Sequence, residues 1–303
     1  MKVAVLIPCY NESRTIGEVV RSFRKELSEA DIYVYDNNST DDTAGQARAA
    51  GAVVRSSPRP GKGRVVRQMF AEVAADVYLL VDGDGTYLAQ DSPRILAPVM
   101  AGECEMCVAD RLVSHAPGSF PSFHKFGNKL IGRLTERLYR VRVGDILSGY
   151  RALSRWLVDE LCLVSSGFEI ETEITVKAVW LGARLKSVAS HYTGRPAGSH
   201  SKLKTFSDGY RVLFTLLTLL REYQPVTMGG LVFIGLAGVG LLLALIGGAR
   251  GSLFMTVSGW GLILGGLIIL ATGVVLHAIN ISAREQEERD KKILGSSRGG
   301  AAA

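Results

Sequence analysis

Two carboxylates, one glycine apart, follow a run of five apolar residues. Val77 to Val81 is typical of a buried strand, and Asp82, Gly83 and Asp84 come directly after it. In an open parallel sheet, ligands bind at the carboxyl ends of strands. Alternation along an extended chain would turn Asp82 and Asp84 to the same side, where they can hold a hard cation such as Mg²⁺ together with phosphate oxygens. The alternative is a polar turn, since Asp and Gly are common turn residues.

Apolar runs alternate with amphipathic segments over the first part of the chain. Strands are expected at 3–8, 32–35, 53–55, 77–81 and 105–109, with helices at about 15–27, 42–50, 65–75 and 91–101. This rhythm predicts an α/β domain with a mainly parallel sheet. No G-x-G-x-x-G follows the first strand, and the loop around Lys62 lacks the spacing of a Walker A motif, which disfavours both kinds of nucleotide site.

Polar residues gather where these predicted strands end. The loops after the first two strands read Cys9-Tyr10-Asn11-Glu12-Ser13 and Asp36-Asn37-Asn38-Ser39. Lys62 stands between two glycines at the start of a predicted helix, which suits a phosphate, although a flexible basic loop is the alternative. Residues 145–151 bring together an acid, a hydroxyl and a guanidinium, and residues 191–202 resemble an anion clamp. The acids at 169–173 open a helix, and complementing its dipole is a sufficient reason for some of them.

Composition narrows the class of protein only slightly. The 303 residues can hold one or two domains. The net charge of +6 allows a basic surface without demanding nucleic acid, because an anionic membrane or a phosphorylated substrate would serve as well. The N-terminus lacks the pattern of a signal peptide, so the N-terminal part is expected in the cytosol. The four cysteines are expected to be free thiols, and Cys104 and Cys107 have no nearby second pair to complete a zinc site.

Apolar residues concentrate after Pro225. Residues 226–249 and 253–278 are each long enough to span a bilayer, and the second contains His277. Both are rich in glycine, which lets two helices pack closely; these residues are Gly235, Gly238, Gly240, Gly259, Gly261, Gly265 and Gly266. Lys and Arg flank the hairpin on both sides, so the positive-inside rule places both flanks in the cytosol. An amphipathic segment at 120–138 either packs on the sheet or lies at a membrane surface, and an amphipathic helix at 205–223 is expected close to the bilayer.

With these residues in view, the chain resembles the inverting glycosyltransferases of family 2 that have a GT-A fold. More narrowly, it is similar to the polyprenyl-phosphate glycosyltransferases, the dolichol-phosphate-mannose-synthase and GtrB-like group. The resemblance covers nearly the whole chain and rests on the order of these motifs: Ile7-Pro8-Cys9-Tyr10-Asn11-Glu12, Asp36-Asn37-Asn38-Ser39, Gly61-Lys62-Gly63, Asp82-Gly83-Asp84, Gly149-Tyr150-Arg151, and Arg195 with Gly198, Ser201 and Lys202.

The resemblance implies a role for each matching residue. A nucleotide sugar would contact Pro8, Tyr10, Asn11, Glu12, Asp36, Asn38, Lys62, Asp82 and Gly83. Asp82 and Asp84 would form the D-x-D motif, whose Mg²⁺ or Mn²⁺ bridges the diphosphate. The acceptor phosphate would be held by Arg111, Arg151, Arg195, Ser201 and Lys202, and catalysis would depend on Asp82, Asp84, Arg111 and Arg195. The D-x-D is followed by Gly-Thr-Tyr, where many members have a Gln that helps to bind the metal, and the second-strand motif is Asp-Asn-Asn-Ser rather than the commoner Asp-Asp-Xaa-Ser.

The domain organisation that this implies is a cytosolic GT-A catalytic domain followed by a membrane anchor. The expected parts are the catalytic domain at 1–204, a juxtamembrane amphipathic helix at 205–224, two transmembrane helices within 225–282, and a partly disordered cytosolic tail at 283–303. The protein would be a multi-pass protein of the cytoplasmic membrane with both termini in the cytosol. Its partners would be a nucleotide-sugar donor, a lipid acceptor and the membrane, without nucleic acid, and a homo-oligomer is left open.

The implied activity is transfer of a hexose, with inversion, from a nucleotide-diphosphate sugar to a polyprenyl phosphate. A UDP-sugar such as UDP-glucose or UDP-N-acetylhexosamine is favoured, GDP-mannose is open, and the acceptor would be undecaprenyl or dolichyl phosphate. One alternative is a processive polysaccharide synthase of the same fold, which the sequence disfavours because no Gln lies three residues before Arg155. Another is a non-catalytic, membrane-anchored sensor of sugar nucleotides.

Overall fold

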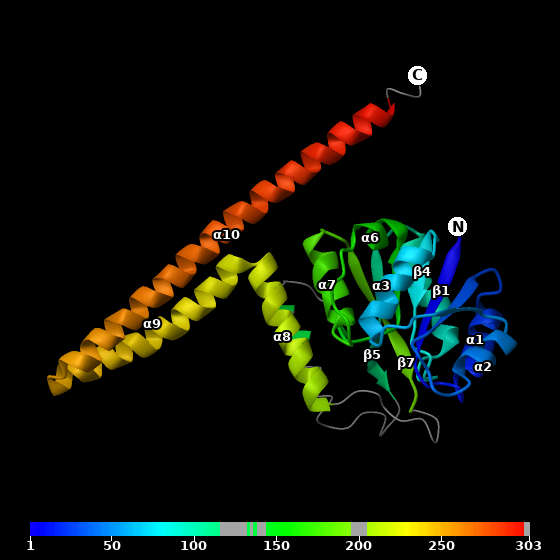
Figure 1. The fold of residues 1–303 in the computed structure, drawn as a ribbon, viewed down its shortest axis with the longest axis horizontal. Coiled ribbons are helices and arrows are strands. Elements are labelled where there is room, and N and C mark those ends of the chain that lie inside the picture. The colour runs from blue at the N-terminus through cyan, green and yellow to red at the C-terminus, as the bar shows by residue number, and fades with distance from the viewer. Residues whose placement is uncertain (116–131, 134–135, 138–143, 195–204, 300–303) are drawn as a thin grey trace. The chain divides into compact units, whose positions relative to one another are not determined.

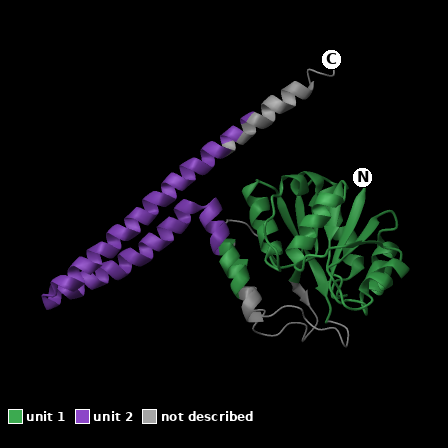
Figure 2. Cartoon of the chain, viewed as in Figure 1, with its two compact units in different colours: residues 1–216 green, residues 217–303 purple. Residues whose placement is uncertain are grey.

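The computed structural model describes residues 1–115, 132–133, 136–137, 144–194 and 205–299. The chain forms two compact units, Met1–Leu216 and Leu217–Ala303 (Figure 2). Most of the amphipathic segment at 120–138 lies outside the described residues, as does the segment that contains Arg195, Ser201 and Lys202.

A seven-stranded sheet forms the centre of the first unit (Figure 1). Its strands are β1 (Val3–Cys9), β2 (Asp31–Asp36), β3 (Val53–Ser56), β4 (Val77–Leu80), β5 (Met106–His115), β6 (Arg151–Ser154) and β7 (Leu185–Tyr192). The strand order is β3-β2-β1-β4-β6-β5-β7, and only β6 runs antiparallel to its neighbours among the described strands. The predicted α/β fold with a mainly parallel sheet is therefore confirmed.

Helices cover both faces of this sheet, which explains why its central strands are continuously apolar. They are α1 (Ile16–Glu26), α2 (Thr43–Ala49), α3 (Lys62–Glu72), α4 (Ser92–Met100), α6 (Arg155–Glu160) and α7 (Ile170–Trp180), with a short 3₁₀ turn at Ala89–Asp91. One apolar cluster joins Val5 and Ile7 of β1 to residues of α1, α2 and α4. The other joins Ala4 and Leu6 to residues of α3, α6 and α7. Alternate residues of β1 thus enter opposite cores.

Two strands of the sheet have no clear signal in the sequence. The four residues of β6 are too short to show a period, and β7 mixes polar and apolar residues because it lies at the edge of the sheet. Helix α3 begins at Lys62, three residues before its predicted start at residue 65. These differences matter for the site, because Arg151 starts β6 and Lys62 starts α3.

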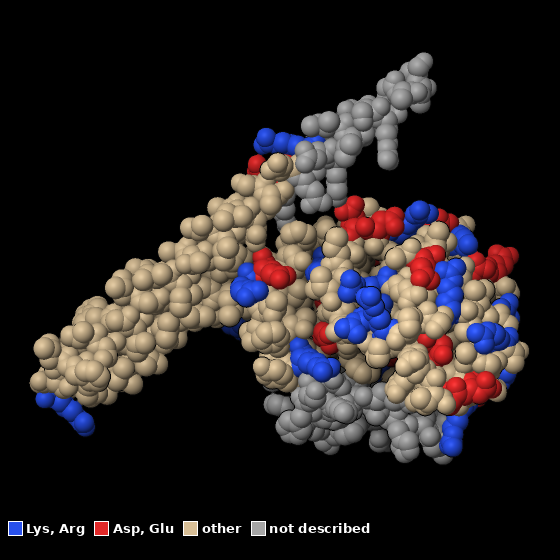
Figure 3. Space-filling model, viewed as in Figure 1, with Lys and Arg blue, Asp and Glu red and all other residues tan. Residues whose placement is uncertain are grey.

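The second unit contains two long helices, α9 (Pro225–Arg250) and α10 (Leu253–Gly299), which follow α8 (Thr205–Tyr223). Helix α9 and the Leu253–Ala283 part of α10 are long and apolar enough to cross a membrane. Figure 3 shows that the visible face of these spans is almost uncharged between its ends. Helix α10 continues past the predicted span through a charged segment, where Glu285 and Arg289 are 3.6 Å apart, one turn along the helix.

Only some of the predicted glycines lie where α9 and α10 meet. A Cβ atom on Gly240 would lie 2.5 Å from the Gly259 carbonyl oxygen, and one on Gly259 would lie 2.4 Å from the Gly240 carbonyl oxygen. A Cβ atom on Gly266 would lie 3.2 Å from the Phe233 ring, whereas one on Gly235 would meet nothing within 4 Å. Gly238, Gly261 and Gly265 also face open space. Close packing of the hairpin therefore depends on particular glycines rather than on glycine content.

Replacing Gly240 with valine should destabilise the hairpin, because the added methyl groups would collide with the backbone of α10. Overpacking of this kind costs about 1–3 kcal/mol. Thermal unfolding of the full chain in detergent would measure the change, with Gly235→Val as a control that adds the same side chain towards open space. Equal melting temperatures for the two variants would contradict this account of the packing.

Candidate active site

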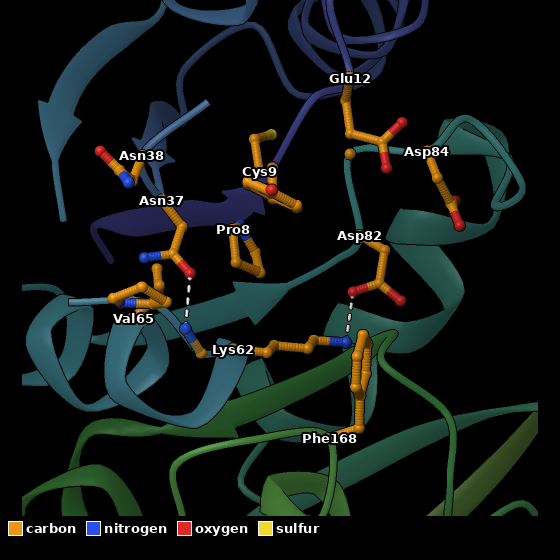
Figure 4. Close-up of a pocket in the computed structure, with 14 residues that line it drawn as sticks. Pro8, Cys9, Glu12, Asn37, Asn38, Lys62, Val65, Asp82, Asp84 and Phe168 are labelled. Atoms are coloured by element: carbon orange, nitrogen blue, oxygen red, sulfur yellow. Dashed lines mark hydrogen bonds and ion pairs between the residues drawn. The ribbon is translucent and has the colours of Figure 1, made fainter. Parts of the chain in front are cut away.

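A cavity of about 370 Å³ lies at the carboxyl ends of β1, β2 and β4 (Figure 4). It is closed on one side by the first turn of α3. Its lining residues are Pro8, Cys9, Tyr10, Glu12, Asn37, Asn38, Pro60, Gly61, Lys62, Val65, Asp82, Gly83, Asp84 and Phe168. Ligand pockets of enzymes commonly have this size and this mixture of apolar and polar groups.

Asp82 and Asp84 both line the cavity, but a turn places them there. Strand β4 ends at Leu80, and Gly83 and Asp84 lie in a turn beyond it. One carboxylate oxygen of Asp84 accepts hydrogen bonds from the Thr86 amide at 3.1 Å and from the Thr86 hydroxyl at 2.6 Å. Thr15 donates to the Gly83 carbonyl at 2.7 Å. These bonds hold the turn in place against α1.

Lys62 forms ion pairs with two carboxylates. Its ammonium lies 2.5 Å from Asp82 Oδ1 and 2.5 Å from Glu171 Oε1, beside the Phe168 ring. Burial by itself lowers the pKa of Lys62, but Asp82 and Glu171 outweigh burial and raise this pKa above its ordinary value. Lys62 therefore remains a cation at the wall of the cavity.

The loop that delivers Lys62 is held by Asn37. The side-chain amide of Asn37 donates to the carbonyls of Ser57 and Arg59, each at 2.8 Å, and its oxygen accepts from the Gly61 amide at 2.8 Å. Gly61 has φ +127°, and a Cβ atom there would lie 2.1 Å from the Ser166 carbonyl oxygen. Only glycine fits this position, because it combines a left-handed backbone with close contact to the chain before α7.

The predicted nucleotide-binding residues fall into two groups. Pro8, Tyr10, Glu12, Asn38, Lys62, Asp82 and Gly83 line the cavity. Asn11 and Asp36 do not line it, and their side chains instead close the loops after β1 and β2. The Asn11 side-chain oxygen accepts from the Thr40 amide at 2.7 Å, and Asp36 accepts from the Ser39 amide at 3.1 Å. These two residues shape the rim rather than face the space inside it.

Arg111 is paired with Asp145, a residue that the sequence prediction left out of the site. One guanidinium nitrogen lies 3.1 Å from Asp145 Oδ1, and Nε donates to the other carboxylate oxygen. The guanidinium also lies 5.9 Å from the Tyr87 ring centre and 5.3 Å from the Tyr192 ring centre. Burial by itself lowers the pKa of Arg111, but Asp145 outweighs burial and raises it.

The Tyr87 ring beside Arg111 is connected to Asp82 through the backbone of Gly149. The Tyr87 hydroxyl accepts from the Gly149 amide at 3.0 Å. A Cβ atom on Gly149 would lie 2.5 Å from Asp82 Oδ2, so the Asp82 carboxylate rests against the Gly149 backbone. The expected acid–hydroxyl–guanidinium segment at 145–151 therefore lies against Asp82 through its residue Gly149.

Arg151 is enclosed in the protein, although it was predicted to hold an acceptor phosphate. Its side chain is fully buried. The guanidinium donates to the Glu171 carbonyl at 3.0 Å, to the Ser148 carbonyl at 2.6 Å and to the Thr175 hydroxyl at 3.2 Å. A phosphate cannot reach this group without displacing those partners. We therefore assign Arg151 to the structure of the site and not to the acceptor.

Glu171 and Phe168 are site residues that the sequence prediction missed. The acids at 169–173 had a sufficient explanation in the helix dipole, and α7 does begin at Ile170. Glu171, however, is buried and directs its carboxylate to Lys62 rather than to its own helix terminus. The only signal in the sequence was an acid placed between apolar residues of a predicted helix. The structure shows that two of these residues, Ile170 and Ile174, lie in the core.

The charge of the cavity decides whether a divalent cation fits. The described lining residues carry three carboxylates, on Glu12, Asp82 and Asp84, against the single ammonium of Lys62. No described group of three or more His, Cys, Asp and Glu side chains is arranged to hold a metal. A divalent cation on Asp82 and Asp84 would therefore complete its coordination with ligand oxygens, as Mg²⁺ does on phosphates. The residues fit a metal that arrives together with a phosphorylated ligand.

Replacing Gly149 with alanine should weaken cation binding by about 10- to 100-fold, because the new methyl group would push the Asp82 carboxylate out of place. Titration with Mn²⁺ in the presence of UDP would measure this change. Gly17→Ala on α1 is the control, since the nearest atom to its added Cβ atom is the mobile end of Arg21 at 3.4 Å. Unchanged Mn²⁺ affinity in Gly149→Ala would refute the support given to Asp82.

Replacing Arg151 with methionine should destabilise the first unit by about 3 kcal/mol or more, because several buried carbonyls would lose their donor. Thermal unfolding would detect this, and the exposed Arg155→Met on α6 should change stability little. A variant with normal stability that had lost only its response to the acceptor would restore the predicted phosphate role of Arg151.

Comparisons with known proteins agree with this geometry. Residues 4–162 match the profile of Glycosyl transferase family 2. Glycosyltransferase AglJ of Haloferax volcanii is 33% identical over 299 residues, which cover 96% of this chain and 98% of that protein. The dolichol-phosphate mannosyltransferase of Pyrococcus furiosus is 28% identical over 254 residues, covering 79% of this chain and 70% of that protein.

Among solved structures, the glucosyl-3-phosphoglycerate synthase of Mycobacterium tuberculosis in complex with Mn²⁺, UDP and phosphoglyceric acid has a similar fold. The TM-score is 0.60 at 24% sequence identity, and the match covers 72% of this chain and 78% of that chain. This likeness confirms the GT-A-like arrangement of the α/β sheet. Since the family profile spans more than half of the sequence and AglJ is similar over almost its whole length, the chain is a glycosyltransferase and belongs to family 2.

Proposed function

We propose that this glycosyltransferase moves a hexose from a nucleotide-diphosphate sugar to a polyprenyl phosphate. The observation that carries the proposal is a carboxylate-lined cavity in a family 2 domain whose chain continues into two apolar helices. The P. furiosus relative is named for dolichol phosphate, which supports a lipid acceptor. The two helices would anchor the enzyme in the cytoplasmic membrane, with the catalytic unit and both flanks in the cytosol.

The donor would lie in the cavity with its diphosphate toward Asp82 and Asp84. The Mn²⁺ and UDP bound by the M. tuberculosis enzyme support a UDP-sugar and a divalent metal, either Mg²⁺ or Mn²⁺. UDP-glucose and UDP-N-acetylhexosamine are the favoured donors, and the name of the P. furiosus relative keeps GDP-mannose among the candidates. Pro8, Tyr10 and Asn38 would contact the nucleoside from the ends of β1 and β2.

The chemistry requires the protein mainly to position two anions. A phosphate monoester dianion is already nucleophilic near neutral pH, so attack on the anomeric carbon needs no strong base. Attack from the face opposite the nucleotide inverts the configuration. A metal bound at Asp82 and Asp84 would stabilise the negative charge on the departing diphosphate.

The cations of the chain would overcome the repulsion between donor and acceptor. Lys62 lies beside Asp82 on the donor side. Arg111, held rigidly by Asp145 between two tyrosine rings, is proposed for the acceptor phosphate together with Arg195, Ser201 and Lys202. Because the Asp145 side chain is fully buried, water does not compete with Arg111 for this carboxylate.

A donor and acceptor screen of the purified full chain in lipid nanodiscs tests this function. Radiolabelled UDP-glucose, UDP-N-acetylglucosamine and GDP-mannose would each be incubated with undecaprenyl or dolichyl phosphate and Mn²⁺ or Mg²⁺. We expect one donor to give an organic-soluble lipid carrying a single labelled sugar, and chelation of the metal to abolish it. Binding of a nucleotide without any labelled lipid would favour a sensor, and a polymeric product would favour a processive synthase.

Replacing Asp84 with asparagine should reduce turnover by about 100-fold or more. Loss of a metal ligand removes several kcal/mol of charge stabilisation, at about 1.4 kcal/mol for each tenfold change in rate. Asparagine retains an oxygen for the two hydrogen bonds from Thr86, so the turn should persist. Asp159→Asn on the exposed face of α6 is the control. Turnover that stays metal-dependent and undiminished in Asp84→Asn would exclude the D-x-D role.

A further inference from the structure

We propose that Lys62 is an exchangeable counter-ion of Asp82, and that Glu171 holds Lys62 in place when it is exchanged. In the absence of donor, Lys62 neutralises Asp82 and keeps the metal from binding tightly. When the donor arrives, its diphosphate takes over the ammonium, and Asp82 becomes available to the metal. The inference rests on the proposed function, because it assumes a diphosphate as the ligand.

The ammonium of Lys62 contacts two carboxylates at the wall of the cavity. Its ammonium touches Asp82 Oδ1 and Glu171 Oε1 at the same distance of 2.5 Å. The side chain of Lys62 is 11% exposed and that of Glu171 only 4%, whereas Asp82 is 26% exposed. Asp82 is thus the partner that faces the ligand space, and Glu171 is the partner behind it.

A metal bound at Asp82 would compete with this ammonium for the same carboxylate. The carboxylate has two oxygens, one in contact with Lys62 and the other resting near the backbone of Gly149. A divalent cation at Asp82 would bring three positive charges around one carboxylate in a poorly solvated space. The metal therefore competes with Lys62 as long as no further anion is present.

A diphosphate removes this competition by supplying new acceptors for Lys62. Glu171 keeps the ammonium at the wall, because its carboxylate is buried and its carbonyl is fixed by the Arg151 guanidinium at 3.0 Å. Lys62 also starts α3, directly after the loop fixed by Asn37, so its main chain need not move. A rotation of the lysine side chain is enough to exchange Asp82 for a phosphate oxygen.

This arrangement couples the binding of the metal to the binding of the nucleotide. By linkage, a nucleotide that draws Lys62 away from Asp82 tightens the metal, and the metal tightens the nucleotide by the same factor. Glu171 acts as a positioning residue, since it contacts the lysine and not the ligand. The two residues should therefore affect metal affinity in opposite directions.

Mn²⁺ binding to the full chain, measured by electron paramagnetic resonance with and without UDP or GDP, tests the inference. Without nucleotide, Lys62→Gln should bind Mn²⁺ about tenfold more tightly than wild type, because the competing cation is gone. Glu171→Gln should bind it more weakly, because Lys62 then pairs with Asp82 alone. With nucleotide present, Lys62→Gln should lose most of the nucleotide-induced gain in Mn²⁺ affinity.

Two further variants separate this effect from general charge and from folding. Arg67→Gln removes a positive charge from the exposed side of the same helix and should leave Mn²⁺ affinity unchanged. Lys62→Arg retains the charge and should show no gain in nucleotide-free Mn²⁺ affinity. Thermal unfolding verifies that each variant is folded, and if Lys62→Gln is not, Lys62→Met replaces it.

Unchanged or weaker nucleotide-free Mn²⁺ binding in folded Lys62→Gln, or in the Lys62→Met that replaces it, would overturn the inference. This arm needs neither donor turnover nor a lipid, so it decides the inference even if no glycolipid forms. Conversely, opposite shifts in Lys62→Gln and Glu171→Gln combined with a negative donor screen would support the exchange and count against the proposed transfer to a polyprenyl phosphate.

Discussion

Compensation of negative charge in a small cavity is the constraint on which this structure depends. The parallel strands β1 and β4 end at the same edge of the sheet and bring Glu12, Asp82 and Asp84 to the lining of one cavity. Carboxylates at this density are stable only with cations close by. Within the part of the chain that the structure describes, Lys62 supplies this charge inside the cavity, and the remainder is left for a ligand and its metal. This charge balance supports the proposal that a phosphate binds here together with a divalent cation.

A few turns and loop residues of the fold position these charged side chains. Helix α3 begins at Lys62, because Gly61 adopts a left-handed conformation against the chain before α7. The turn after β4 is held by Thr15 and Thr86, and Gly149 supports Asp82 from behind. Asp82 and Asp84 are thus held by neighbouring segments of the chain, which is how a site keeps its geometry when a charged ligand arrives.

Arg111 and Arg151 were both predicted to hold the acceptor phosphate, but the structure places them in different surroundings. Arg111 on β5 reaches the tyrosine pair beside the site, where Asp145 holds its guanidinium. Arg151 starts β6 and enters the protein interior, where it ties the chain at 146–148 to α7. Its removal from the acceptor site leaves Arg111 as the described arginine that is proposed to meet the acceptor. The buried Arg151 also donates to the backbone carbonyl of Glu171, whose carboxylate pairs with Lys62.

The sequence alone determined the order of most elements, the mainly parallel α/β class, the family resemblance, the carboxylates at the end of β4 and the two long apolar helices. These features are local: periodicity, turn residues and uninterrupted apolar length can be read within a few residues. Only the tertiary structure decided that Glu171 pairs with Lys62, that Asn11 and Asp36 close loops, and that Gly240 rather than Gly235 lies between the two long helices. Such contacts join segments far apart in the chain. They depend on the order of strands in the sheet and on the rotation of each helix, which no local pattern specifies.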